Sequence, residues 1–299
     1  MEVVVPARIH CLESVDPGEI RRVQLALPEH ITIEGTTYVM KDSMRPGTAF
    51  LTKPWGSRTQ KPRRRMYTRS NIASTEPGIL ETFINDTHSS RSDTSAWWQS
   101  EDAYEWYVNQ KPLEVRVTLD PEIRLARVYE NTMLVKPANL RLEEDGVWER
   151  MPMILVAFGT GVTPFLSYVR YMARHWANTE GSENPAPVIL IASARHEQQL
   201  ILHDELLTLA DTASHWFRYH PVLTRTWPDD WGHTRGRMLR DGPSPENASN
   251  IDLSPFLELV SDPSKSHLRL CGNSQACQQL VQGLSQLGIT PMSIRSESW

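Results

Sequence analysis

The sequence predicts two domains of different class: an antiparallel β-barrel over residues 1–150, followed by a doubly wound parallel α/β domain over residues 151–299. The chain has 299 residues, about twice the ~150 residues of a typical domain. Short alternating or β-branched segments fill the first half, whereas strand-like and helix-like segments alternate in the second. The division falls at the apolar run Met151–Phe158, which is typical of a strand buried on both faces.

Strand signals dominate residues 1–150. Apolar and polar residues alternate through Val23, Leu25 and Leu27, and proline–glycine pairs mark turns between the short segments. The other strands that we expect are Ile31–Ile33, Thr36–Met40, Glu114–Thr118 and Met133–Val135. Residues 84–104 are rich in Ser, Thr and Asp, so we expect a mobile surface insertion there.

Residues 151–299 alternate between strand and helix. Apolar residues recur at helical spacing over Pro164–His175, where Thr163 is expected to cap the helix and Pro164 to occupy its first turn. The remaining expected strands are Val188–Ala192, Tyr219–Leu223 and His267–Cys271, and the remaining expected helices are Gln199–Ala210 and Cys277–Leu287, the last ended by Gly288. Such alternation predicts a parallel sheet covered by helices.

Composition excludes several classes of protein. The three cysteines cannot form a disulfide framework or hold an iron–sulfur cluster, which needs four thiolates, and no metal site is expected. A formal net charge of -5 argues against nucleic-acid binding. No apolar run approaches the ~20 residues of a membrane helix, and the N-terminus lacks the features of a secretory signal. We therefore expect a cytoplasmic protein with no membrane association.

A glycine-rich turn follows the apolar strand, where Gly159–Pro164 is Gly-Thr-Gly-Val-Thr-Pro. Glycines allow a tight turn and the close approach of phosphates to backbone amides, and a helix N-terminus favours their charge. The third glycine of the full dinucleotide fingerprint is absent. The turn predicts a nucleotide-phosphate site, and an ordinary strand–helix turn is the alternative.

Three further segments carry chemistry. In Arg65-Met-Tyr67-Thr68 an arginine can pair with a diphosphate, a ring can stack on a planar ligand and a hydroxyl can bond a ring nitrogen; an ordinary exposed strand is the alternative. The segment Cys271–Asn273 ends a predicted strand at the ligand-binding edge of an α/β sheet, or holds a buried structural cysteine. The terminal Trp299 is expected to dock, if only into a hydrophobic gap.

In this order the motifs resemble the ferredoxin–NADP reductase family of flavoproteins, over nearly the whole chain. Arg65–Thr68 matches the family pattern R-x-Y-S/T, Gly159–Pro164 matches G-T-G-V/I-A/T-P, and Cys271–Asn273 matches C-G-N/L. The ending Glu297–Trp299 matches a Glu-x-aromatic terminus, and Pro46–Phe50 is similar to the family's proline–glycine strand entry.

The resemblance implies that the barrel binds FAD and the α/β domain binds NADP. Arg65 would contact the FAD diphosphate, and Tyr67 and Thr68 the isoalloxazine, while Trp299 covers the flavin. The implied cofactor-binding residues are Arg65, Tyr67, Thr68, Trp299, Gly159, Thr160, Gly161, Thr163, Pro164, Arg225, Arg237, Cys271, Gly272 and Asn273. The implied catalytic residues are Cys271 beside the nicotinamide, Glu297 for proton and electron transfer, Trp299 and Thr68.

Two arginines favour NADP over NAD. Arg225 follows the expected strand Tyr219–Leu223, and Arg237 follows Gly236; both resemble positions where the family binds the adenosine 2′-phosphate. Two guanidinium groups on a dianion form strong, charge-assisted bonds, whereas an NAD site typically offers an acidic residue to the ribose. Solvated surface arginines are the alternative.

One segment departs from the family. Its second flavin-phosphate segment usually carries Gly and Ser, but the corresponding Pro121–Arg127 has neither. Arg124 or Arg127 is a candidate substitute for the phosphate anchor. The adenine pocket is therefore not assigned.

Residues 53–70 contain seven cationic side chains and no acidic one, in a chain of net charge -5. Such a patch can steer an acidic protein partner or hold phosphates; a nuclear-localisation-like or nucleic-acid-binding segment and a solvated loop are the alternatives. Apart from Arg65, the patch consists of Lys53, Arg58, Lys61, Arg63, Arg64 and Arg69, which we predict to dock a partner. Ferredoxins and flavodoxins are generally acidic and fit this role.

The sequence thus predicts a monomeric FAD enzyme that moves electrons between NADPH and a separate carrier, a ferredoxin or flavodoxin, by hydride transfer to flavin N5. One alternative is a reductase of flavins, ferric chelates or a dedicated oxygenase. A more distant one is a non-catalytic nucleotide-binding subunit.

Overall fold

The computed structural model describes residues 1–16, 19–41, 47–53, 65–72, 75–85, 93–130, 151–177, 185–241, 251–260 and 262–298. They form two compact units: Met1–Thr132 with Leu166–Tyr171, and Met133–Phe165 with Met172–Trp299. The predicted division between residues 150 and 151 stays a prediction, because residues 131–150 lie outside the described part of the chain.

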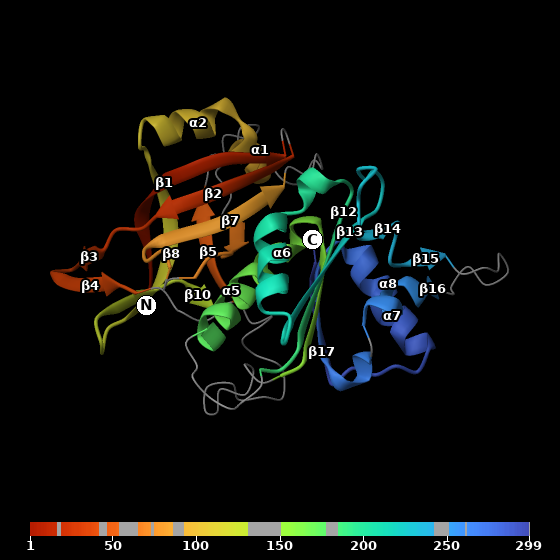
Figure 1. Cartoon of the computed structure of the whole chain (residues 1–299). Coiled ribbons are helices and arrows are strands. Elements are labelled where there is room, and N and C mark those ends of the chain that lie inside the picture. Colours follow the sequence, from red (N-terminus) through yellow and green to blue (C-terminus); the bar gives the residue numbers. More distant parts are fainter. Residues whose placement is uncertain are drawn as a thin grey trace. The chain divides into compact units, whose positions relative to one another are not determined.

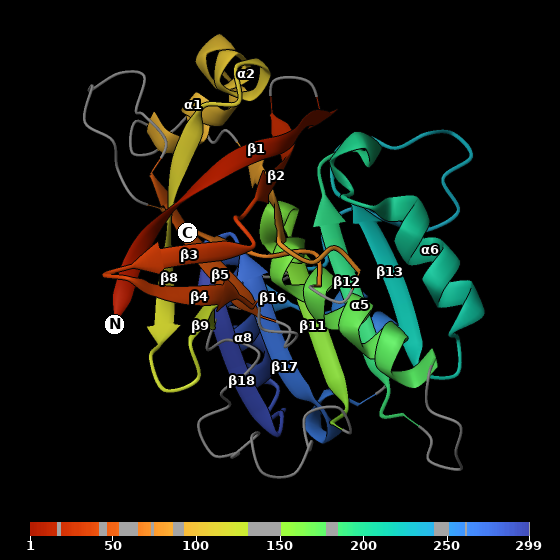
Figure 2. The same ribbon diagram turned by 90° about the vertical axis from the view of Figure 1, so that its left-hand side faces the viewer.

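The first unit is built on a curled, mostly antiparallel sheet (Figures 1 and 2). Its strands are β1 (Glu2–Asp16), β2 (Ile20–Ala26), β3 (His30–Ile33), β4 (Thr36–Met40), β5 (Thr48–Lys53), β6 (Arg65–Thr68), β7 (Ile79–Asn85), β8 (Pro112–Asp120), β9 (Leu125–Arg127) and β10 (Tyr129–Glu130). The strand order is β3-β4-β9-β8-β1-β2-β7, and β5 pairs with β6, β8 and β10. The predicted antiparallel half is confirmed; the expected strand at residues 133–135 lies outside the described residues.

Alternation along the long strands builds the core of this unit. In β1 the side chains of Val5, Ala7 and Ile9 are buried, while their neighbours in sequence face outward. In the antiparallel register Val5 lies opposite Val115 of β8, which is also buried. One face of the curled sheet is therefore the core.

The segment predicted as a surface insertion is partly core, so that prediction was wrong for Trp97, Trp98 and Ala103, which are buried. It contains the helix α1 (Asp93–Gln99) and the start of α2 (Glu101–Val108), and Trp97 and Trp98 are buried in the unit's core. Two tryptophans are enough to pack an otherwise polar segment against the core, because each can bury 150–250 Å². The side chain of Gln99 also donates to the carbonyls of Ile84 and Glu19, both at 3.4 Å.

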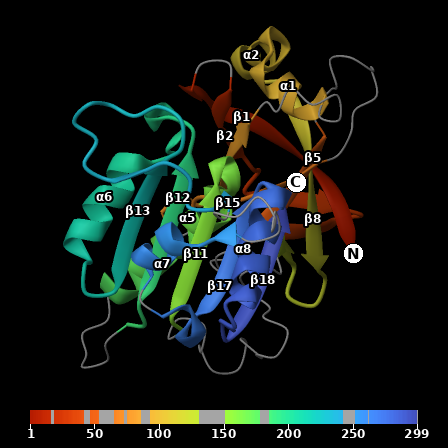
Figure 3. The same ribbon diagram turned by 90° about the vertical axis from the view of Figure 1, so that its right-hand side faces the viewer.

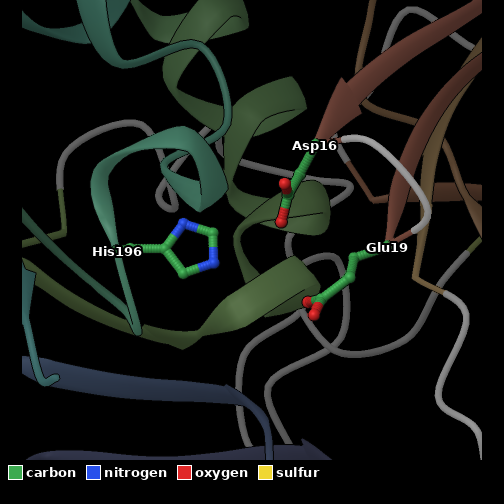
Figure 4. Close-up of side chains that lie close together, drawn as sticks. All are labelled: Asp16, Glu19 and His196. Atoms are coloured by element: carbon green, nitrogen blue, oxygen red, sulfur yellow. The ribbon is translucent and has the colours of Figure 1, made fainter. Parts of the chain in front are cut away.

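The β1–β2 turn that Gln99 reaches is acidic. Asp16 ends β1, Glu19 precedes β2, and the Glu19 N–H donates to the Asp16 carbonyl at 3.0 Å. Figure 4 shows both carboxylates extending to the same side of the turn. The link through Gln99 attaches α1 to the end of the sheet.

A buried carboxylate joins strands of the first unit to helix α5 (Thr163–Ala177), whose residues 166–171 belong to that unit. Glu81 of β7 is fully buried and accepts from Arg22 at 2.7 Å, from Arg170 at 2.9 Å and from Ser70 at 2.7 Å. Burial opposes ionisation, but Arg170, Ser70 and Arg22 together hold the pKa of Glu81 below its usual value. The carboxylate is therefore charged, and two arginines pair with it.

The second unit is a parallel sheet with the order β14-β13-β12-β11-β17-β18. Its strands are β11 (Met153–Phe158), β12 (Val188–Ala194), β13 (Phe217–Leu223), β14 (Thr234–Arg235), β17 (His267–Gly272) and β18 (Ser293–Ser298), beside a small antiparallel pair of β15 (Arg240–Asp241) and β16 (Ile251–Asp252). Besides α5, its helices are α6 (His203–Thr212), α7 (Ser254–Leu259) and α8 (Ser274–Gln286). Helices cover both faces, with α7 and α8 together on one (Figure 3).

The expected elements of this unit are confirmed in type and order, and Gly288, at φ 68°, follows the end of α8. Short 3-10 turns occur at Gly159–Val162, Glu197–Gln199 and Pro263–Lys265. From β11 the chain passes to β12 and then β13, and it later returns to β17 on the other side of β11. The strand order therefore reverses between β11 and β17, which is where open α/β sheets bind ligands. No helix in the described part of the chain is long and apolar enough to cross a membrane.

Candidate functional site

The two glycine segments predicted from sequence meet at the carboxyl ends of β11 and β17. A Cβ atom on Gly161 would overlap the carbonyl oxygen of Cys271, and one on Gly272 would overlap that of Phe158. Both positions therefore require glycine, because backbone packs directly on backbone. Gly159 has φ +60°, and a Cβ built there meets no atom within 4 Å, so the turn is open on that side.

The glycine turn leads directly into a helix. Residues Gly159–Val162 form the 3-10 turn, and α5 follows from Thr163. The Thr163 hydroxyl donates to the Thr160 carbonyl at 2.7 Å, rather than accepting a helix N–H as expected. Backbone amides at the start of a helix favour a phosphate. The turn thus fits a diphosphate on backbone atoms alone.

Cys271 and Glu297 lie side by side at this edge, since they are paired in the register of β17 and β18. Cys271 is fully buried, and burial, then the charge of Glu297, raises the pKa of its thiol. The thiol is therefore neutral. Asn273 caps α8, its side chain accepting from the Ala276 N–H at 3.0 Å, and Trp299 lies outside the described residues.

The two arginines predicted to select NADP follow the ends of neighbouring strands. β13 pairs with β14 in parallel, with Leu223 opposite Arg235; Arg225 and Arg237 each come two residues later. Both are exposed. Arg237 also lines a cavity of about 240 Å³ with Arg240 and Gln279. The structure thus places both guanidinium-bearing residues at one edge of the sheet.

A third arginine at this edge was missed from the sequence. Arg195 follows β12, and its carbonyl accepts the backbone N–H groups of Arg225 and Thr226, both at 3.1 Å. Its own side chain donates to Gln199 at 3.0 Å. The signal was present, because Arg195 comes shortly after the expected strand Val188–Ala192, as Arg225 comes after its own strand.

In the first unit, β6 presents the residues predicted to hold a flavin. Arg65 and Tyr67 lie on the same face of the strand, about 7 Å apart along it. Arg65 is exposed and Tyr67 is half-buried, so a cation and part of an aromatic ring face the same side of β6. Burial raises the pKa of Tyr67, and its hydroxyl accepts the Trp98 indole N–H at 3.1 Å. A flat ring joined to a diphosphate fits this arrangement, and Thr68 follows on the opposite face.

The predicted docking patch is smaller than the sequence suggested. Arg69 is fully buried, donating to Asn71 at 2.8 Å and to the Ile79 carbonyl at 2.8 Å, so its assignment to the patch was wrong. It follows β6, which directs its side chain into the unit. Lys53 lies 3.8 Å from the Glu114 carboxylate. Arg58, Lys61, Arg63 and Arg64 lie outside the described residues.

The segment that departs from the family contains a tight turn. Arg124 has φ 51°, and Arg127 of β9 donates to Asp120 at 2.8 Å. Both arginines are exposed, and the ion pair engages Arg127 within its own sheet. Arg124 is therefore the better candidate for a second phosphate anchor.

Comparison with known proteins agrees with this geometry. Residues 155–280 match the model of the oxidoreductase NAD-binding domain, while no characterised protein matches the chain by sequence alone. The chain has the fold of the ferredoxin–NADP reductase family. The resemblance to that family is thereby confirmed at the level of the fold, and the match to the oxidoreductase NAD-binding domain lies largely in the second unit.

Three solved structures illustrate the fold. The flavohemoglobin-like FAD/NAD-binding domain of nitric oxide dioxygenase from Vibrio cholerae is 14% identical with a TM-score of 0.64, covering 99% of this chain and 98% of that one. The cytochrome b5 reductase domain of nitrate reductase from Ulva prolifera is 16% identical with a TM-score of 0.61, covering 99% and 97%. A ferredoxin–NADP+ reductase variant from Plasmodium falciparum, in complex with 2′P-AMP, is 13% identical with a TM-score of 0.58, covering 99% and 96%.

Proposed function

We propose that this reductase-fold chain binds FAD and transfers electrons between NADPH and a separate one-electron carrier, a ferredoxin or flavodoxin. The observation that carries the proposal is the pair of glycine segments at the β11–β17 edge, where a side chain would fill the space between two backbone segments. Such an edge accepts a dinucleotide diphosphate, and its position at the strand-order reversal is the usual ligand site.

The flavin-binding residues are those of β6. Arg65 holds the diphosphate through charge-assisted bonds, the Tyr67 ring lies against the isoalloxazine, and the Thr68 hydroxyl bonds a ring nitrogen. FAD supplies the hydride and one-electron chemistry when it is bound. The protein's contribution is to hold the ring still, and the Trp98 N–H fixes Tyr67 for this purpose.

In the second unit, the turn of Gly159, Thr160 and Gly161, with Thr163 and Pro164 beginning α5, holds the NADPH diphosphate. Arg225 and Arg237 bind the 2′-phosphate. Cys271 and Gly272 close the wall beside the nicotinamide, and Asn273 keeps the start of α8 in place.

The catalytic pair is Cys271 and Glu297. A neutral thiol packs beside the nicotinamide and orients it without carrying charge. Glu297, the register partner of Cys271, holds or releases a proton near the ring. Trp299, which lies outside the described residues, would cover the flavin by analogy with the family's aromatic terminus.

The acceptor is the finer part of the proposal. The basic segment of residues 53–65 favours an acidic carrier. A dedicated oxygenase or another redox enzyme is the second candidate, since two of the similar structures are domains of nitric oxide dioxygenase and nitrate reductase. Free flavins or ferric chelates are further acceptors to compare.

The test begins with the purified protein, which should be yellow and should oxidise NADPH faster than NADH. Turnover is then compared with ferredoxin, flavodoxin, free flavin and a ferric chelate as acceptors. Protein that takes up no FAD would point to a nucleotide-binding subunit instead. Reversing Arg58 and Lys61 to Glu should slow turnover with the protein carrier and flatten its salt dependence, while ferricyanide reduction continues as the control.

A further inference from the structure

Four aromatic side chains of the first unit form a continuous chain from Tyr67 to the surface helix α2. Ring centroids lie 6.3 Å apart for Tyr67 and Trp98, 4.9 Å for Trp98 and Trp97, and 5.7 Å for Trp97 and Trp106. Every step is edge-to-face, with interplanar angles of 88°, 79° and 88°. The Trp98 N–H also donates to the Tyr67 oxygen. The rings are thus in direct contact from one end to the other.

Burial changes along this chain in one direction. Trp98 is 0% exposed and Trp97 is 1% exposed, whereas Trp106 is half-buried on α2. The inner rings are therefore shielded from water and the last ring reaches it. Tyr67, at the other end, is the residue of β6 proposed above to contact the isoalloxazine.

Tyrosine and tryptophan are the aromatic side chains that lose a single electron most readily. Where two such rings are in contact, the electron vacancy left on one ring can be filled by an electron from the next. We propose that Tyr67, Trp98, Trp97 and Trp106 form an electron-transfer relay through which light reduces the flavin without NADPH. The relay rests on the proposed function, because it needs a flavin at Tyr67. It adds a second route for electrons, which enter at α2.

Each absorbed photon moves one electron. With FAD bound, an electron would leave Trp98 and reach the photoexcited flavin through the contact with Tyr67. Trp97 would then reduce Trp98, and Trp106 would reduce Trp97; a second photon would repeat these transfers. Trp106 is left oxidised and releases its indole proton to water. A soluble thiol restores the electron and proton, so that two photons convert two thiols to one disulfide while the flavin gains two electrons and two protons.

Charges beside the rings favour this outward movement of the vacancy. The guanidinium of Arg21 donates to the backbone carbonyl of Trp98 at 3.1 Å, so a positive charge lies near the backbone of this buried residue. Lys111 lies 6.0 Å from the Trp106 ring centroid, but its ammonium is also 4.0 Å from the Glu105 carboxylate and is exposed to water.

The experiment uses the full chain loaded with FAD, without oxygen or NADPH, under blue light with dithiothreitol as the thiol. The parent should show a transient tryptophan radical by optical absorption and a steady loss of oxidised-flavin absorbance. Trp106→Phe keeps an aromatic ring on α2 but cannot supply the electron, so both signals should fall several-fold. NADPH-driven flavin reduction should stay at the parent rate.

Tyr104→Phe is the matched control, since Tyr104 is an exposed, oxidisable ring of the same helix outside the four-residue chain. It should match the parent in photoreduction. Trp97→Phe should act like Trp106→Phe if it folds, and Trp106→Phe decides the question if it does not. Equal photoreduction in the parent and Trp106→Phe, in protein that binds FAD and oxidises NADPH, would overturn the relay alone. Protein that binds no flavin would overturn the relay and the proposed function together.

Discussion

At the carboxyl edge of the second unit's sheet, Gly161 and Gly272 let backbone pack on backbone. In the first unit, buried side chains meet instead: Glu81 binds two arginines, and Trp98 binds Tyr67. The first arrangement joins two short segments through their backbone atoms, as Gly161 and the Cys271 carbonyl show. The second joins charged and polar side chains of separate elements, as Arg170 and Glu81 show.

The difference separates what each unit tolerates. A site made of backbone depends on the absence of side chains, so that adding one methyl group breaks it. A site made of buried charge depends on every partner being present, because an unpaired buried charge is costly. Substitutions in the two units should therefore fail for opposite reasons.

The largest expected effect is in the first unit. Glu81→Gln removes the buried charge and leaves Arg22 and Arg170 facing a neutral amide, so we expect a loss of about 3–5 kcal/mol in the free energy of unfolding. Denaturant unfolding of parent and variant measures it. Glu114→Gln, which changes an exposed partner of Lys53, is the control and should cost less than about 1 kcal/mol.

The same carboxylate also sets an acid limit. Because the folded-state pKa of Glu81 lies below its ordinary 4.5, the folded state binds fewer protons, and its contribution is complete above that value and lost as the pH falls below it. Glu81→Gln should flatten the acid side of the stability profile. A variant whose profile falls as steeply as the parent's would show that other carboxyl groups set the limit.

The next effect is in the second unit. Gly161→Ala places a methyl group on the Cys271 carbonyl, and this backbone cannot move aside as a flexible side chain can. We therefore expect the free energy of unfolding to fall by about 3 kcal/mol and NADP binding to be lost. Gly159→Ala is the matched control: it has open space but φ +60°, which costs about 1–2 kcal/mol. Equal melting temperatures for the parent and Gly161→Ala would mean that the turn after β11 can move away from the end of β17 at little cost.

These two regions also show what sequence could predict. The glycine turn, Cys271 and the arginines after β13 and β14 lie on or beside predicted strands, and strand order alone brings their ends to one edge. Local patterns therefore predicted the strands and helices of the second unit, whereas the roles of the residues at this edge stay predictions. Arg195 was missed, although it obeys the same rule.

In the first unit the sequence predicted the strands but not what packs between them. Trp97 and Trp98 stand in a polar segment without helical periodicity, so only the fold shows that the sheet buries them. Arg69 belongs to a run of cations, yet its place just after β6 turns it inward. Side-chain direction at the end of a short strand depends on register, which the sequence alone does not specify.

A smaller effect concerns binding by side chains in the second unit. Arg225→Ala or Arg237→Ala should each weaken NADPH binding by about 2 kcal/mol, a value typical of hydrogen bonds to charged groups. NADH binding should be unchanged. Titration calorimetry with both nucleotides measures this. Arg218→Ala, on the exposed side of β13, is the control. Equal losses for NADPH and NADH would assign the arginines to the structure of the loop rather than to the 2′-phosphate.

The smallest expected effect is a titration in the same unit. His203 of α6 contacts the hydroxyl of Tyr219 at 3.2 Å and stacks on Trp231 at 5.5 Å between centroids. Trp231 belongs to the loop between β13 and β14, which begins near Arg225, and its indole N–H donates to the Thr234 carbonyl at 3.2 Å. His203 therefore packs against the loop that carries a predicted 2′-phosphate ligand.

Burial, and then His233, lowers the pKa of His203, while Asp204 and Glu197 oppose the shift. The folded state therefore prefers neutral His203, and its contribution is complete above the usual value of 6.5 and is lost as the pH falls below it. The protection of the loop amides from hydrogen exchange, relative to their intrinsic rate at each pH, should fall on acidification through that range, and NADPH binding should weaken with it. Since His203 is only half-buried, the change should be smaller than the others. His203→Gln keeps a polar side chain without the titration and should remove this pH dependence; an identical profile in that variant would place the titrating group elsewhere.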